Sequence, residues 1–210
     1  MAAVICPTIT AQTPDEYRTQ MERVTPFAGR LHLDAADGQL APRHLLDLDK
    51  LWWPGNKMVD LHVMYRQPFQ HTELFIAQHP NLVIVHAEAE GDFRSFADRL
   101  HRQGIEVGVA LLPATDVRVI APAIQKIDHV LIFSGNLGYQ GGSRADLSLL
   151  TKVRELRRLK PGLEVGWDGG VSAENIRQLI VGGVDVLNVG GYIQHAVNPA
   201  RAYATLEAAA

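Results

Sequence analysis

The chain has 210 residues, of which 47% are hydrophobic and 20% are charged, and its formal net charge at pH 7 is −3. This composition is typical of a globular protein, and the small net charge gives no basic surface for nucleic acid. Cys6 is the only cysteine, which excludes an intramolecular disulfide, and the chain shows neither a signal peptide nor an apolar run long enough to cross a membrane. We therefore expect a cytoplasmic protein with no nucleic-acid partner and no membrane association.

Short apolar segments alternate along the chain with segments of helical pattern. We expect strands at residues 4–9, 30–36, 57–64, 82–89, 106–112, 129–135, 163–170 and 185–191. We expect helices at residues 14–24, 68–78, 92–103, 116–124, 144–159 and 173–181, and Thr13 is a candidate cap for the first of them. Strands that alternate with helices predict parallel pairing with crossover connections.

The number of these strand–helix units predicts an α/β fold, a single (β/α)₈ TIM barrel that covers residues 1–210 as one domain. An open doubly wound sheet is the alternative. That sheet would usually carry a glycine-rich turn after its first strand, whereas the first strand here ends in CPTIT. We therefore favour the barrel.

Polar residues occur near the carboxyl ends of several expected strands, where TIM barrels place their catalytic groups. The second strand reads LHLDAADG, the third DLHVM, the fourth VHAEA and the seventh WDGG. The residues concerned are His32, Asp34, His62, His86, Glu88 and Asp168.

Four of these side chains, from three strands, are expected to project toward one rim of the barrel. They are His32, Asp34, His62 and Asp168. Burying such groups together without a partner would be costly, and a divalent cation would remove that cost. Two imidazoles and two carboxylates suit Zn²⁺, Mn²⁺, Fe²⁺ or Co²⁺.

Two glycine pairs follow the last two strands. Gly169-Gly170 ends the seventh strand and Gly190-Gly191 ends the eighth. Barrels often bind phosphate at these two loops through backbone N–H groups. The loop GNLGYQGG at residues 135–142 adds backbone that can approach a ligand closely. We therefore expect a phosphorylated ligand.

These motifs, taken in order, resemble those of the ribulose-phosphate 3-epimerases. LHLDAADG resembles the second-strand signature of that family, DLHVM the third-strand D-x-H-x-M, VIVHAEA the fourth-strand H-x-E and WDGGV the seventh-strand D-G-G. CPTIT resembles the start of the first strand, and VDVLNVGGYI resembles the eighth-strand phosphate loop. The resemblance spans nearly the whole chain.

The resemblance implies an isomerase of carbohydrate metabolism, in the pentose phosphate pathway, that converts D-ribulose 5-phosphate to D-xylulose 5-phosphate. It implies that Asp34 and Asp168 are the two acid/base groups. It also implies one divalent metal ion on His32, Asp34, His62 and Asp168, with Zn²⁺ as the first expectation, and it allows a homo-oligomer. The expected substrate-binding residues are Thr8, Met64, His86, Asn136, Gly138, Gly141, Gly169, Gly170, Gly190 and Gly191.

The departures from the family pattern lie around the substrate. Ala36 stands where the family usually has Met, Leu137 stands in a Pro position, and Gly191 replaces a Ser. An epimerase of a hexulose 6-phosphate therefore stays open, as does a non-catalytic barrel that binds a sugar phosphate. The decarboxylase and aldolase branch of the same superfamily typically carries D-x-K-x-x-D on the third strand, and the segment from Asp60 to Met64 has no lysine.

Overall fold

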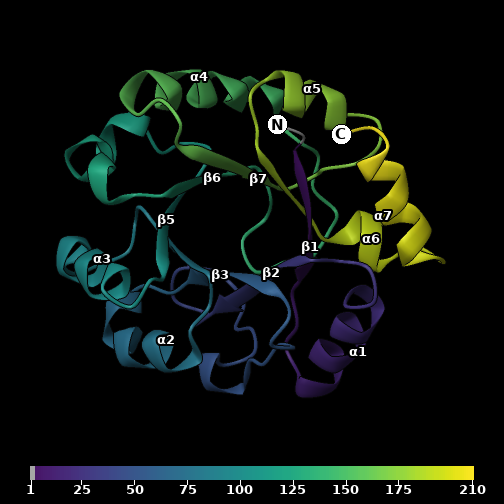
Figure 1. Cartoon of the computed structure of the whole chain (residues 1–210), viewed down its shortest axis with the longest axis horizontal. Coiled ribbons are helices and arrows are strands. Elements are labelled where there is room, and N and C mark those ends of the chain that lie inside the picture. The colour runs from purple at the N-terminus through teal and green to yellow at the C-terminus, as the bar shows by residue number, and fades with distance from the viewer. Residues whose placement is uncertain (1–2) are drawn as a thin grey trace.

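The computed structural model describes residues 3–210 and shows a closed barrel of eight strands in chain order. Figure 1 shows the strands as an inner ring and the helices outside it. The strands are β1 (Val4–Ile9), β2 (Arg30–Ala36), β3 (Met58–Met64), β4 (Leu82–His86), β5 (Glu106–Leu111), β6 (His129–Phe133), β7 (Glu164–Asp168) and β8 (Val186–Val189). The predicted TIM barrel is confirmed.

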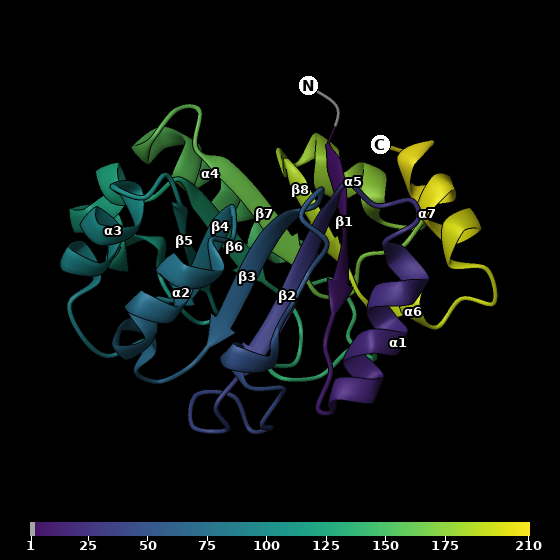
Figure 2. The same cartoon turned by 60° about the horizontal axis from the view of Figure 1, so that its bottom comes forward.

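Every strand pairs in parallel with the next, and β1 pairs with β8 to close the ring. Parallel pairing brings the carboxyl ends of all strands to one face, so residues far apart in sequence meet there. In Figure 2 that face is at the bottom, where the strands end in long loops, and the N-terminus lies at the opposite end.

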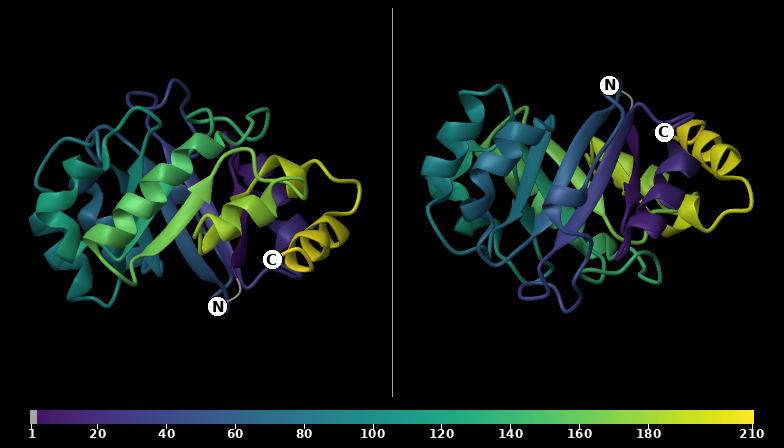
Figure 3. Two further views of the ribbon diagram at one scale, coloured as in Figure 1. Left: turned by 90° about the horizontal axis from the view of Figure 1, so that it is seen from above. Right: turned by 90° about the horizontal axis from the view of Figure 1, so that it is seen from below.

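The helices are α1 (Pro14–Val24), α2 (Thr72–Gln78), α3 (Phe93–His101), α4 (Leu150–Leu159), α5 (Ile176–Val181), α6 (Gly191–Gln194) and α7 (Pro199–Glu207). The predicted cap of the first helix is present, since the Thr13 hydroxyl accepts a hydrogen bond from the Glu16 amide. The C-terminal helix α7 lies beside α1 on the outside of the barrel (Figure 3).

The helix predicted at residues 116–124 is wrong. The structure has two 3₁₀ helices there, Val117–Val119 and Ala121–Lys126. Pro122 has no backbone N–H, and inside an α-helix its ring would clash with the carbonyl four residues earlier. Several expected strands also end sooner than predicted; for example, β4, β6 and β7 stop at His86, Phe133 and Asp168.

The main apolar core lies between the strands and the surrounding helices. Trp167 of β7 is fully buried in this layer, and its indole N–H donates to the Gly169 carbonyl at 3.0 Å. A second, smaller apolar cluster is formed by Leu82, Ile84, Ala110 and Leu131. These two layers leave the carboxyl ends of the strands free for polar side chains.

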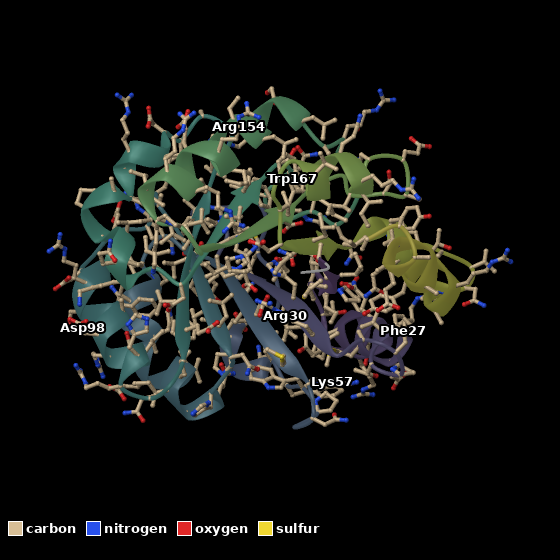
Figure 4. The ribbon with its side chains drawn as sticks, turned by 45° about the horizontal axis from the view of Figure 1, so that its top comes forward. Phe27, Arg30, Lys57, Asp98, Arg154 and Trp167 are labelled. Atoms are coloured by element: carbon tan, nitrogen blue, oxygen red, sulfur yellow. The ribbon has the colours of Figure 1, made fainter. Side chains whose placement is uncertain are left out.

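Charged side chains occupy the amino end of the barrel. Arg30 lies toward the centre of the molecule in Figure 4, whereas Lys57 and Asp98 lie nearer its edge. The Arg30 guanidinium donates to both oxygens of Asp60 and, through two further nitrogens, to both oxygens of Glu164. The His129 Nδ1 lies 2.7 Å from the same Glu164 carboxylate. The network joins β2, β3, β6 and β7.

Replacing Glu164 with glutamine should destabilise the fold at neutral pH and make stability less sensitive to acid. Burial raises the pKa of Glu164, but hydrogen bonds from His129 and Arg30 outweigh burial and hold the pKa below its usual range. The carboxylate therefore stabilises the fold above its unfolded pKa, and this contribution is lost as the pH falls toward its folded pKa. Since the side chain is 34% exposed and partly screened, we expect a loss of about 1–2 kcal/mol at pH 7.

Urea unfolding of both proteins at neutral and acidic pH measures this difference. The gap between wild type and Glu164→Gln should narrow as the pH falls below the unfolded pKa of a glutamate, about 4.3. Glu155→Gln is the matched control, because Glu155 is an exposed residue of α4, and it should leave stability unchanged. An equal gap at both pH values would contradict the network's role.

Candidate active site

The four residues predicted to bind a metal converge at the carboxyl end of the barrel. His32 and Asp34 come from β2, His62 from β3 and Asp168 from β7. Asp34 and His62 are direct neighbours in the β2–β3 register, so their side chains project to the same side of the sheet. One ligand atom from each of the four residues lies within 4.8 Å of all the others.

Imidazole nitrogens and carboxylate oxygens face one another in this cluster. The His62 Nδ1 lies 2.9 Å from the Asp34 Oδ1 and 4.0 Å from the Asp168 Oδ2. The His32 Nε2 lies 3.3 Å from the same Asp34 oxygen and 3.6 Å from the same Asp168 oxygen. Neither ring nitrogen of His32 makes a hydrogen bond in the protein, although the residue is fully buried. These donors fit a divalent cation.

The environments of the two carboxyl groups differ. Burial raises the pKa of Asp168 to about 7, and the nearby charge of Asp34 acts in the same direction. Burial also raises the pKa of Asp34, but the imidazoles of His32 and His62 outweigh burial and hold it below its usual range. The Thr10 hydroxyl donates to the Asp34 Oδ2 at 2.6 Å and further favours its ionised form. Carboxyl groups with separated pKa values are typical of acid/base pairs.

A chain of polar contacts runs from His62 toward the outside of the barrel. The His62 Nε2 lies 2.9 Å from the His86 Nε2, and the His86 Nδ1 lies 3.6 Å from the Glu88 Oε2. With Nδ1 of His62 directed at the candidate metal, its Nε2 carries the proton and donates to His86. His86 then carries its own proton on Nδ1, which faces the Glu88 carboxylate. This chain fixes the tautomer of His62.

The loop after β5 holds the outer end of this chain. The Thr115 hydroxyl donates to Glu88, and the Lys152 ammonium donates to the carbonyls of Leu112 and Thr115 at 2.6 and 2.7 Å. Burial raises the pKa of Glu88, but the contacts to His86 and Thr115 outweigh burial and lower it. Glu88 is therefore held as an anion beside His86.

A pocket of about 720 Å³ opens above the cluster, with Asp34 and Asp168 in its wall. Gly169 and Gly170 have φ values of +113° and +70°, which favour glycine. A Cβ atom on Gly169 would lie 2.3 Å from the Gly135 nitrogen, and one on Gly170 would lie 2.1 Å from the Ala145 nitrogen. The loop after β6 thus lies directly against the seventh-strand glycine pair.

Comparison with known proteins assigns this site to a family. Residues 4–194 match the model of the "Ribulose-phosphate 3 epimerase family". The chain is 30% identical to the ribulose-phosphate 3-epimerase of Schizosaccharomyces pombe, over 80% of this chain and 76% of that protein. It is 32% identical to the enzyme of Helicobacter pylori strain J99, over 78% of each protein. The chain belongs to the ribulose-phosphate 3-epimerase family. The prediction of an epimerase-like isomerase is confirmed at this level.

Solved structures place the epimerase chain in the same fold. A 3-hexulose-6-phosphate synthase superposes with a TM-score of 0.73 and 19% identity, over 98% of this chain and 99% of that one. KGPDC from Streptococcus mutans, in complex with D-ribulose 5-phosphate, superposes with a TM-score of 0.75 and 12% identity, over 100% of this chain and 97% of that one. At these identities the likeness concerns the fold alone.

Most of the predicted substrate-binding residues of the epimerase lie around the pocket. His86 is different, because it lies behind His62 and is not part of the pocket wall. The predicted residues that line the pocket are Thr8, Met64, Asn136, Gly138, Gly141, Gly169, Gly170, Gly190 and Gly191.

The small side chain of Ala36 is buried in a compact apolar cluster. Ala36 packs with Ala41, Leu45 and Met64, and Leu137 of the loop after β6 packs against the cluster. Protein atoms therefore occupy the space beside Ala36. The two departures from the family pattern, at positions 36 and 137, lie in contact with the same cluster.

Two polar residues near the pocket were missed by the sequence reasoning. Thr10 follows the end of β1 and reaches Asp34, which is 24 residues later in the chain. Asn188 lies in β8 among apolar residues and lines the pocket. A polar residue inside the apolar run VDVLNVGG is the signal that could have revealed Asn188.

Within residues 3–210, the structure contains no helix with the length and hydrophobicity needed to cross a membrane.

Proposed function

We propose that this protein is a metal-dependent ketose-phosphate 3-epimerase that interconverts D-ribulose 5-phosphate and D-xylulose 5-phosphate. The observation that carries the proposal is the convergence of Asp34 and Asp168 with two imidazoles in one cluster below a glycine-lined pocket. A non-catalytic sugar-phosphate-binding barrel would have no need for two carboxyl groups of such different pKa at this point.

Asp34 and Asp168 act as the base and the acid on opposite faces of the substrate. The ionised carboxylate removes the proton from C3, which leaves an enediolate, and the protonated carboxyl group returns a proton to the other face of C3. The bond from C3 to its first hydrogen breaks and a new C–H bond forms with inverted configuration. The two carboxyl groups then hold each other's initial protonation state.

His32, Asp34, His62 and Asp168 would hold one divalent ion, with Zn²⁺ as the first choice and Mn²⁺, Fe²⁺ or Co²⁺ as alternatives. When bound, the cation supplies positive charge beside the ketone and enediolate oxygens. The chain's own residues orient that site, because Thr10 fixes Asp34 and His86 fixes His62.

The chain of contacts from His62 to Glu88 predicts a graded effect on metal affinity. Glu88→Ala keeps all four candidate ligands but removes the anion beside His86, so His62 is held less firmly in the tautomer that directs Nδ1 at the cation. We expect the affinity for Zn²⁺ to fall about 10- to 100-fold, measured by competition with a chromophoric chelator.

Glu90→Ala is the matched control for this measurement, because Glu90 lies two residues further along the same loop and pairs with Arg66 on the surface. Its affinity for Zn²⁺ should equal that of wild type. An unchanged affinity in Glu88→Ala would show that the ring of His62 is held by packing, for example against Phe133, rather than by these polar contacts.

The backbone around Gly169, Gly170, Gly190 and Gly191 is the proposed phosphate site, since its glycines allow close approach of a ligand. A pentulose is favoured over a hexulose. Leu137 packs against the cluster around Ala36, so the small side chain does not leave room for an additional carbon.

Solvent-deuterium exchange followed by NMR tests this function with a panel of pentulose and hexulose phosphates. D-Ribulose 5-phosphate should incorporate deuterium at C3 and convert to D-xylulose 5-phosphate. Faster exchange with a hexulose 6-phosphate would assign the alternative epimerase. No exchange with any compound in the presence of added divalent metal would favour the sugar-phosphate-binding barrel.

A further inference from the structure

Asn188 is a buried polar side chain that has no hydrogen-bond partner in the protein. Its exposed fraction is 1%, and neither Nδ2 nor Oδ1 makes a hydrogen bond to another described residue. An amide offers two donors and one acceptor oxygen, and leaving them unpaired in a buried position costs free energy. The residue therefore makes no contribution to the polar networks of the fold.

The register of the sheet places Asn188 beside the candidate reaction centre. Asn188 pairs directly with Asp168 on β7 and with Cys6 on β1. Thr8 lies two residues after Cys6, and its hydroxyl is also buried without a partner among the described residues. Asp168, Asn188 and Thr8 all line the pocket. Two unpaired polar groups thus stand next to one proposed acid/base group.

An apolar residue would suit position 188 if only packing mattered. Its neighbours in β8 are Leu187 and Val189, both buried and apolar, and β-branched residues are favoured in strands. Places where a sequence breaks the packing rules without compensation inside the fold are expected at functional sites. The missing partner of the amide is then a ligand in the pocket.

We infer that Asn188 is a specificity-determining residue that binds a hydroxyl group of the sugar phosphate. Asn188 lies between Asp168, which acts at C3, and Gly190, which belongs to the proposed phosphate site. The hydroxyl that it binds is therefore the one on C4. An amide can donate to a hydroxyl oxygen and accept from its hydrogen at the same time, and the Thr8 hydroxyl contributes beside it. The inference rests on the proposed function.

Asn188→Leu tests the inference, because leucine has nearly the shape of asparagine but cannot form hydrogen bonds. The kcat/KM for D-ribulose 5-phosphate should fall about 10- to 100-fold, whereas that for its 4-deoxy analogue should stay unchanged. The unfolding temperature of the ligand-free variant should equal or exceed that of wild type, because an unpaired buried amide has been removed. A structural role for the amide would instead lower it.

Asn188→Val is the second variant and should show the same loss of discrimination. Asn198→Ala is the control, because Asn198 caps α7 by accepting a hydrogen bond from the Arg201 amide. This control should lower the unfolding temperature and leave discrimination intact. The inference is overturned if Asn188→Leu keeps the preference for the 4-hydroxyl compound, or if neither Asn188 variant folds.

Failure of the inference can be distinguished from failure of the proposed function. A wild-type protein that epimerises no ketose phosphate contradicts the function itself. Binding can still be measured as the rise in unfolding temperature caused by D-ribulose 5-phosphate and by its 4-deoxy analogue. Equal rises for the two compounds in wild type would overturn the inference without reference to turnover.

Discussion

Replacing Asp168 or Asp34 with asparagine should lower the rate of epimerisation by about 10²–10⁴-fold. An amide can neither remove the C3 proton nor supply one, while its size matches that of the carboxyl group, so the barrel should still fold. The conversion of D-ribulose 5-phosphate to D-xylulose 5-phosphate, followed by NMR at saturating metal, measures the effect. Asp128→Asn is the control, because Asp128 pairs with His101 on the surface and should tolerate the change.

Proton exchange in D₂O gives a sharper form of this test. With one carboxylate removed, the remaining carboxylate still faces one side of C3, so it should exchange the C3 proton of only one epimer. The two variants should therefore differ in which epimer exchanges. Exchange of the same epimer by both variants would contradict the assignment of Asp34 and Asp168 to opposite faces. The metal content of each variant is measured in parallel, since both residues are candidate ligands.

The candidate metal site could be predicted from sequence because it depends on local pattern and on one property of the fold. His32 and Asp34 stand two apart, so a strand directs both to the same side. The closed barrel then brings the ends of β2, β3 and β7 to one face. Given this order of strands, the meeting of these residues with His62 and Asp168 follows.

Other features depend on packing between distant segments, which the local pattern does not contain. The missing partner of Asn188 is a property of how β1, β7 and β8 close around it. The position of His86 behind His62 depends on the direction of two side chains. The break of the 116–124 segment was visible as Pro122, but the alternation of strands and helices outweighed that signal.

Removing the divalent ion should abolish epimerisation and lower the unfolding temperature of the protein. The cluster gathers two imidazoles and two carboxylates in a buried position, and the cation offsets the cost of bringing them together. A metal present at about 1,000 times its dissociation constant contributes about 4 kcal/mol of stability. Chelator titration with calorimetry and an activity assay measures both effects.

Adding metals back to the stripped protein separates a role in chemistry from a role in stability alone. Zn²⁺, Mn²⁺, Fe²⁺ and Co²⁺, added singly, should each raise the unfolding temperature according to its affinity, and those that also restore turnover are the effective ions. His32→Ala should weaken both responses, because it removes one imidazole that has no other partner among the described residues. Full activity of metal-free protein would contradict the ligand set.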